Sequence, residues 1–124
     1  MATRAVYSFT GFPGTPVHHL YLHHDGYPSG AAWRFASALR HHMAATAFLT
    51  AFQCTQPQAE VLSHPDQAAD AEYRYVVTLQ PGPTSMLQVQ CWRRHPGHNH
   101  WSPRCGPMAL SLFIERFLPA GLEH

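Results

Sequence analysis

The chain of 124 residues has the length of one domain, and a hydrophobic share of 45% against a charged share of 12% excludes a disordered chain. The formal net charge is +1, which disfavours a nucleic-acid partner, because such binders carry a basic excess against phosphate. We expect a single domain over residues 1–121, and residues 122–124 resemble a purification-tag remnant. A surface with so few charges is consistent with a homodimer.

No apolar run reaches the ~18 residues that cross a bilayer, so no membrane span is predicted. The N-terminus lacks the apolar segment of a signal peptide. Three cysteines are an odd number, as expected where thiols stay reduced. These features predict a cytoplasmic protein.

The first part of the chain contains two strand patterns. Side chains alternate in polarity over residues 4–9, and leucines alternate with His and Tyr over residues 17–23. The segment GFPGTP at 11–16 predicts a turn between them, because Gly and Pro favour turns. Sequential strands with a short connection usually pair antiparallel.

A helix is predicted after the Asp25-Gly26 step, beginning near Gly30 or Ala31 with Ser29 as its N-cap. Arg34 is expected to lie away from its apolar face. That face is predicted to consist of Ala32, Phe35, Ala36, Leu39 and Met43. The pattern predicts a break near His42 and a second helix over residues 44–52.

The second part of the chain predicts a connecting segment, a hairpin, a loop and a last helix. Residues 55–71 are polar and include two prolines, whereas residues 72–79 and 86–92 alternate as strands around a turn at 81–85. A loop is expected over 93–107 and a helix over 108–118, ended by Pro119. The order β-β-α-α-β-β-α predicts an α+β fold with an antiparallel sheet of about four strands and helices on one face.

Three stretches, TRAVYSF, LYLHHDGYPSGAAWRF and AEYRYVV, carry a resemblance. The chain resembles a family of small proteins from bacteriophages, prophages and other mobile elements, which place a DGYPxG motif between a strand and a helix and carry a later E-Y-x-Y strand. The matching positions are Thr3, Arg4, Asp25, Gly26, Tyr27, Pro28, Gly30, Glu72, Tyr73 and Tyr75. The resemblance implies a phage-linked setting in a bacterial host cell and no particular chemistry.

A candidate metal site lies in CWRRHPGHNHWSPRC, residues 91–105. Thiolates and imidazoles are the ligands that zinc prefers. The candidate ligands are Cys91, His95, His98, His100 and Cys105. Their spacing, C-x3-H-x2-H-x-H-x4-C, matches no standard zinc motif, and Cys91 occupies a strand position expected to be buried. A polar loop between two unrelated core cysteines is the favoured alternative.

A second candidate site is the segment from His23 to Gly30. His23 or His24 with Asp25 could form a general base, but no nucleophile stands at a motif position. We expect the motif residues to hold the turn and the helix start instead, since Asp and Gly favour such turns. These residues are Asp25, Gly26, Tyr27, Pro28 and Gly30.

Trp92 and Trp101 flank the loop rich in Arg and His and are the best candidates for an exposed aromatic patch. The sequence favours a non-enzymatic protein that binds another macromolecule, expected to be a protein, through these tryptophans or through the DGYPxG turn with His24. A zinc-binding protein with a structural site at 91–105 is the alternative. A small hydrolase that uses His23 or His24 with Asp25 is a third hypothesis.

Overall fold

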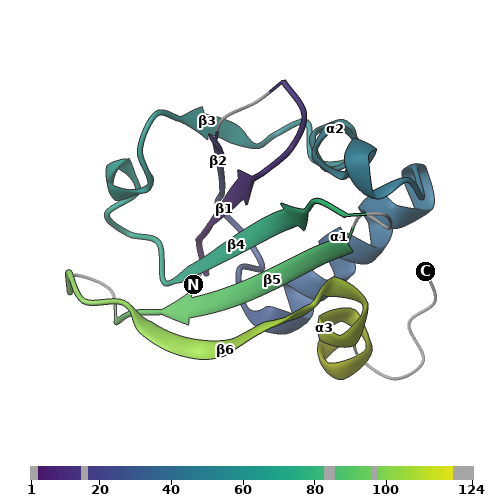
Figure 1. Ribbon diagram of the computed structural model, residues 1–124. Helices are drawn as coiled ribbons and strands as arrows, with labels where there is room; N and C mark the ends of the chain where they lie inside the picture. The colour runs from purple at the N-terminus through teal and green to yellow at the C-terminus, as the bar shows by residue number, and fades with distance from the viewer. Residues whose placement is uncertain (1–2, 15–16, 83–85, 96–97, 119–124) are drawn as a thin grey trace.

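In the part of the chain that the structure describes, six strands form one sheet in the order β3-β2-β1-β4-β5-β6 (Figure 1). The computed structural model describes residues 3–14, 17–82, 86–95 and 98–118. Parts of the predicted turns at 11–16 and 81–85, Pro119 and the tag-like residues 122–124 lie outside these ranges. The strands are β1 Ala5–Thr10, β2 Val17–Leu22, β3 Glu60–Leu62, β4 Tyr73–Gln80, β5 Met86–Arg93 and β6 Ser102–Ala109.

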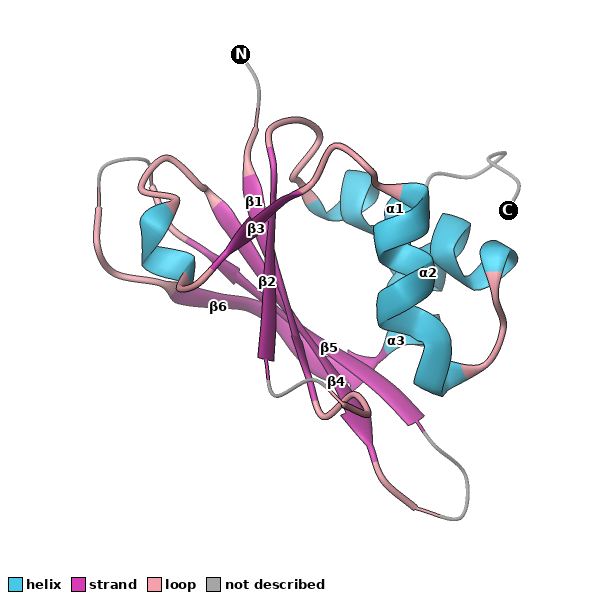
Figure 2. Cartoon of the chain, turned by 90° about the horizontal axis from the view of Figure 1, so that it is seen from above, coloured by secondary structure: helices cyan, strands magenta, loops and turns pink. Residues whose placement is uncertain are grey.

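Three α-helices cover one face of this sheet (Figure 2). They are α1 Pro28–His41, α2 Phe48–Thr55 and α3 Leu110–Phe117, with a short 3-10 turn η1 Ala45–Ala47 ahead of α2. A second 3-10 turn, η2 Pro65–Gln67, lies on the opposite face. In the part of the chain that the structure describes, no helix is long and apolar enough to cross a membrane.

The predicted α+β class is confirmed, but the prediction of about four antiparallel strands is wrong. The sheet is mixed, because β1 pairs in parallel with β4 and antiparallel with β2. The chain leaves edge strand β3 through η2, crosses the face opposite the helices and enters β4 beside β1 in the same direction. This crossing places β1 between β2, its neighbour in sequence, and the distant β4.

Two strands, β3 and β6, were not predicted, because their sequences lack the alternation typical of a strand. β3 has three residues, which is too short for alternation to be visible. β6 has the sequence SPRCGPMA, and its prolines and glycine predicted a loop. An edge strand tolerates proline, and β6 pairs with β5 through two register shifts that absorb the irregular residues.

The sheet centre is buried on both sides. In β1, Tyr7 and Phe9 face the helices, whereas Val6 faces the segment around η2. The Tyr7 and Tyr75 rings stack with centroids 5.0 Å apart beneath Phe35 of α1. These contacts fix α1, and with it the turn that precedes α1, against β1 and β4.

The start and the faces of the helices differ from the prediction at several points. α1 begins at Pro28, with Tyr27 as N-cap and no side-chain cap from Ser29, because proline suits the first helical position. Met43 is 87% exposed because α1 ends at His41 before reaching it. The second helix was predicted over 44–52 but spans Phe48–Thr55, since residues 45–47 form η1. Arg34 is buried rather than turned to solvent.

Candidate functional site

The turn between β2 and α1 is shaped by Asp25, Tyr27 and Pro28. Asp25 has φ 55°, a left-handed conformation that Asp tolerates better than most residues. Its carboxylate accepts a hydrogen bond from the Tyr27 hydroxyl over 2.9 Å, and this bond raises the pKa of Tyr27. Tyr27 is extended, as a residue before proline prefers, and its carbonyl accepts the first helical hydrogen bond, from the Ala31 amide.

Two glycines let this turn pack tightly against its neighbours. A Cβ on Gly26 would lie 2.9 Å from both the Ala5 Cβ and the Thr3 carbonyl oxygen, and a Cβ on Gly30 would lie 2.0 Å from the Asp25 carbonyl oxygen. The Gly26 amide donates to the Thr3 carbonyl over 2.9 Å. At each of these two glycines, any larger side chain would prevent the close packing of the turn against its neighbours.

Arg34, one helical turn after Gly30, is the central charged group of this region. Its side chain is 8% exposed. Nε donates to Gln56 Oε1 over 3.2 Å, and Nη1 donates to the Asp25 carbonyl over 2.9 Å and to the Tyr7 hydroxyl over 3.5 Å. Among the described residues, Nη2 has no hydrogen-bond partner and no carboxylate oxygen lies within 4.0 Å of the guanidinium, so its direct contacts are with neutral groups.

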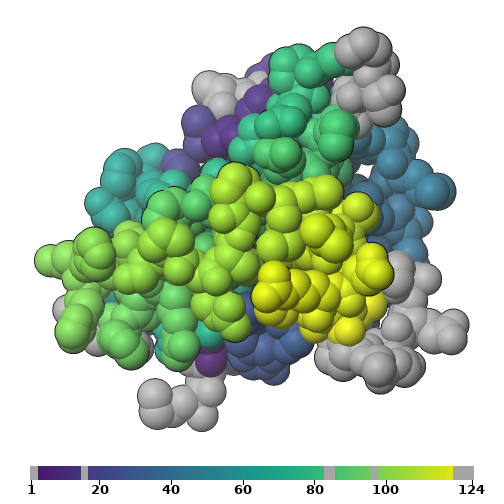
Figure 3. Space-filling model, turned by 60° about the horizontal axis from the view of Figure 1, so that its bottom comes forward, coloured from purple at the N-terminus to yellow at the C-terminus, as the bar shows by residue number. Residues whose placement is uncertain are grey.

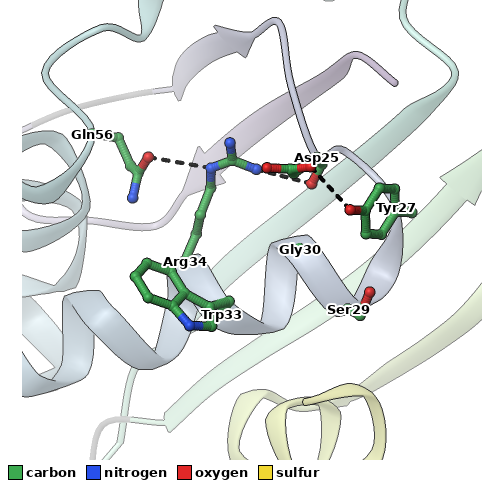
Figure 4. Close-up of a pocket in the computed structure, with 7 residues that line it drawn as sticks. All are labelled: Asp25, Tyr27, Ser29, Gly30, Trp33, Arg34 and Gln56. Carbon is green, nitrogen blue, oxygen red and sulfur yellow. Dashed lines mark hydrogen bonds between the residues drawn. The ribbon is translucent and has the colours of Figure 1, made fainter. Parts of the chain in front are cut away.

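A cleft of about 430 Å³ opens beside this guanidinium. Figure 4 shows Arg34 and Trp33 extending from one turn of α1, with the guanidinium held between Gln56 and Asp25. Trp33 and Tyr27 are 44% and 43% exposed although both are large and apolar. The lining consists of Asp25, Tyr27, Ser29, Gly30, Trp33, Arg34 and Gln56. A cavity of this size, mostly apolar with a few polar groups, is typical of a binding site for a small group.

Two buried tyrosines support the cleft from the sheet side. The Tyr75 hydroxyl donates to the Gly26 carbonyl over 2.5 Å, and burial is the main reason why its pKa is raised. Burial also raises the pKa of Tyr7 to about 12, although the nearby Arg34 cation acts in the opposite direction. Both hydroxyls therefore stay protonated near neutral pH and serve as fixed hydrogen-bonding groups.

The His-Asp pair required for the hydrolase hypothesis is not assembled in the described residues. His24 is exposed and does not line the cleft, and Nε2 of His23 lies 3.2 Å from a Glu60 carboxylate oxygen. The Asp25 carboxylate is engaged by Tyr27 rather than by an imidazole. Of the residues in that hypothesis, only Asp25 belongs to the cleft.

The predicted zinc ligands are also not gathered at one point. Cys91 is buried in the core under the helices, whereas His95, His98 and His100 are exposed at the far end of β5. Within the ranges 3–14, 17–82, 86–95 and 98–118, no three His, Cys, Asp or Glu side chains form a group that could hold a metal ion. The prediction that the two cysteines are unrelated is wrong, because Cys91 and Cys105 are paired across β5 and β6.

The two tryptophans near this loop are half-buried rather than an open patch. The Arg94 guanidinium lies 4.2 Å from the centroid of the Trp101 ring. Arg94 donates to the carbonyls of Ala71 and Ala68 over 2.8 and 2.7 Å, which ties the segment around η2 to the sheet. Trp101 therefore shields a structural arginine, and Trp92 lies in β5 opposite Pro103.

Sequence reasoning missed Arg34 and Gln56, the two residues that give the cleft its charge and its polarity. Arg34 was predicted to face solvent because arginine usually does. The available signal was its position four residues after Gly30, since these residues lie on the same face of a helix. Gln56 lay in a segment predicted to be a connection, so nothing in its neighbourhood indicated a site.

Comparison with protein-family models, with curated proteins and with solved structures found no match to the chain. The resemblance to proteins of mobile elements, carried by the DGYPxG and E-Y-x-Y stretches, therefore stays a prediction. The geometry of the Arg34 cleft is the main guide to what the chain does.

Proposed function

We propose that this chain is a non-enzymatic binding protein that takes a carboxylate of a partner protein into the Arg34 cleft. The single observation that carries the proposal is the guanidinium of Arg34: the residue is 8% exposed, neutral groups hold Nε and Nη1, and Nη2 has no hydrogen-bond partner among the described residues. An incoming carboxylate would supply an acceptor for this free donor and a charge of opposite sign.

The two aromatic side chains at the cleft favour a protein as the partner. Tyr27, just before α1, and Trp33, within α1, are both exposed at the cleft, where they can contact apolar groups next to the carboxylate. Trp, Tyr and Arg are the residue types most enriched at the energetic centres of protein interfaces. An acidic side chain or a chain terminus flanked by apolar residues would fit this combination.

The sign of the charge selects among possible ligands. Arg34 is the only cationic side chain among the residues that line the cleft, and Asp25 is the only anionic one. Among the described residues, the free donor in the cleft is Nη2 of Arg34, whereas Asp25 can only accept hydrogen bonds while it is ionised. A monovalent carboxylate suits this site better than a phosphate with two negative charges, because the Asp25 carboxylate repels the more highly charged anion more strongly.

The test uses NMR titration of the isotope-labelled protein with N-acetylphenylalanine, which combines a carboxylate with an aromatic group. We expect saturable shifts of the Trp33 indole N–H and of the Arg34 Nε–H, with affinity on the order of millimolar for so small a probe. N-acetylphenylalanine amide, which lacks the charge, should bind at least about tenfold more weakly.

Two arginine variants on the same helix separate the cleft from general charge effects. Arg34→Gln should abolish the saturable shifts, whereas Arg40→Gln should retain them, because Arg40 is exposed and lies outside the cleft. Equal binding of acid and amide, or equal loss in both variants, would refute the proposal. Photo-crosslinking from position 33 in a host lysate would then identify the partner.

A further inference from the structure

Cys91 and Cys105 lie directly opposite each other on neighbouring strands. They are register partners across the antiparallel pair of β5 and β6. Opposite residues in such a pair place their side chains on the same face of the sheet, and both contact the core beneath the helices. Both cysteines are free thiols in this structure.

The spacing of such partners suits a disulfide. Residues that face each other across antiparallel strands have Cα atoms about 4.5–5.5 Å apart, and disulfides span about 4.4–6.8 Å. The pairing of β5 with β6 shifts register on both sides of Cys91, between Val89 and Cys91 and between Cys91 and Trp92. The two cysteines are therefore in register at the point between two irregular segments.

The two thiols differ in their access to solvent. Cys91 is 0% exposed, whereas Cys105 is half-buried on β6, the edge strand that forms part of the outer surface in Figure 3. Burial, followed by the neighbouring Cys105, raises the pKa of the Cys91 thiol well above its ordinary value. A reagent from solution therefore meets Cys105 first, and Cys91 lies behind it as the second thiol.

We propose that Cys91 and Cys105 are a dithiol site that low-molecular-weight disulfides, such as oxidised glutathione, convert to a cross-strand disulfide. The Cys105 thiolate attacks one sulfur of the oxidant, which forms a mixed disulfide and releases one reduced thiol. Cys91 loses its proton and attacks the Cys105 sulfur, which forms the protein disulfide and releases the second thiol. Two electrons and two protons pass from the protein to the oxidant, and the reaction reverses in excess thiol.

The modification would fasten the edge of the sheet covalently. β6 continues directly into α3, which packs on the core, so the bond would tie both elements to β5. It would also close the segment between the two cysteines, including the exposed histidines, into a loop. Closing such a loop restricts the unfolded chain and favours the folded one.

The test starts from the full chain with Cys54→Ser, because Cys54 on α2 is exposed and is the remaining thiol that could react. After incubation with oxidised glutathione, intact mass should fall by about 2 Da, and a digest should link the peptides of Cys91 and Cys105. Glutathione in its reduced form should restore the mass. Ring closure should accelerate about tenfold per pH unit between roughly pH 7 and 9, because the thiolate of Cys91 is scarce there.

Cys91→Ala in the same background should stop at one stable glutathione adduct on Cys105, and Cys105→Ala should take up no oxidant while folded. The idea is overturned if the Cys54→Ser chain keeps its full mass, if it ends as the mixed disulfide, or if oxidation yields only dimers between chains. The Cys54→Ser result decides the matter even if the variants at Cys91 and Cys105 fail to fold.

Discussion

The substitution Gly30→Ala is the sharpest test of the packing of the turn before α1, because two physical effects change the free energy of unfolding in opposite directions. Gly30 lies inside α1, where alanine is normally more stable than glycine by about 1 kcal/mol. The new Cβ would lie 2.0 Å from the Asp25 carbonyl oxygen, however, against 3.4 Å or more for ordinary contact. The carbonyl must therefore move by more than about 1 Å, away from its bond with Arg34.

The expected cost exceeds the gain in helix propensity. Strain from an inserted methyl group is typically about 1–3 kcal/mol, and a lost hydrogen bond to a charged group costs about 1.5–3 kcal/mol. After the helical gain is subtracted, Gly30→Ala should lower the free energy of unfolding by roughly 1.5–5 kcal/mol. In urea unfolding followed by circular dichroism, the midpoint should fall by about 0.8–2.5 M.

Ser37→Ala is the matched control, since Ser37 lies on the same helix and its hydroxyl donates only to the Trp33 carbonyl of the preceding turn. This control should stay within about 0.5 kcal/mol of the parent. If Gly30→Ala is as stable as the parent or more stable, the Asp25 carbonyl does not lie close to Gly30. Its hydrogen bond with Arg34 at the cleft is then refuted as well.

Three further predictions concern the supports of the fold. Burial lowers the pKa of His19, so the unfolded chain binds more protons below about pH 6.5 and stability should fall as pH drops through that range. His19→Gln should flatten this dependence in urea midpoints measured from pH 7.5 to 5, and an unchanged slope would contradict the assignment. Tyr75→Phe should lower the free energy of unfolding by about 1–2 kcal/mol, because the Gly26 carbonyl loses its donor, with no change in the alkaline titration of the exposed Tyr27. Arg94→Lys should lower the free energy of unfolding, measured by heat or urea, by about 2–4 kcal/mol, since an ammonium cannot reach both carbonyl partners as the planar guanidinium does. Full stability of this variant would show that Arg94 does not hold the segment around η2 to the sheet.

The elements with strong periodicity could be predicted from the sequence, and those without it could not. Alternation placed Tyr73, Tyr75 and Val77 on one buried face, and the structure confirms this arrangement. The same rules assigned β6 to a loop, because proline and glycine carry that meaning in a central strand but not at a bulged edge. Parallel pairing of β1 with β4 depends on how the chain crosses the sheet, which no local pattern records.

For the candidate site, the sequence indicated the turn but not its charge. The DGYPxG residues act on the backbone of their own turn, so their roles could be inferred from residue type alone. Burial of Arg34 depends on Gln56, the residue directly after α2, and on Tyr7 from β1, which lie 22 and 27 residues away in the chain. Spacing rules cannot detect such a long-range arrangement. The candidate zinc ligands show the converse, because His95, His98 and His100 line one surface pocket whereas Cys91 lies in the core, and the described residues contain no group that could hold a metal ion.

The position of β1 in the middle of the sheet has a consequence for the time course of folding. Residues 5–10 must find residues 73–78 to complete the parallel pair, and the Val6 face of β1 is covered only when the segment around η2 has crossed the sheet. Closing so long a loop costs conformational entropy before the strands gain stabilising contacts. Folding is therefore slower than in helical proteins of this size. During synthesis, the first strand would therefore wait with apolar side chains unpaired until most of the chain had emerged, and that interval is when this protein is most exposed to aggregation or most in need of a chaperone.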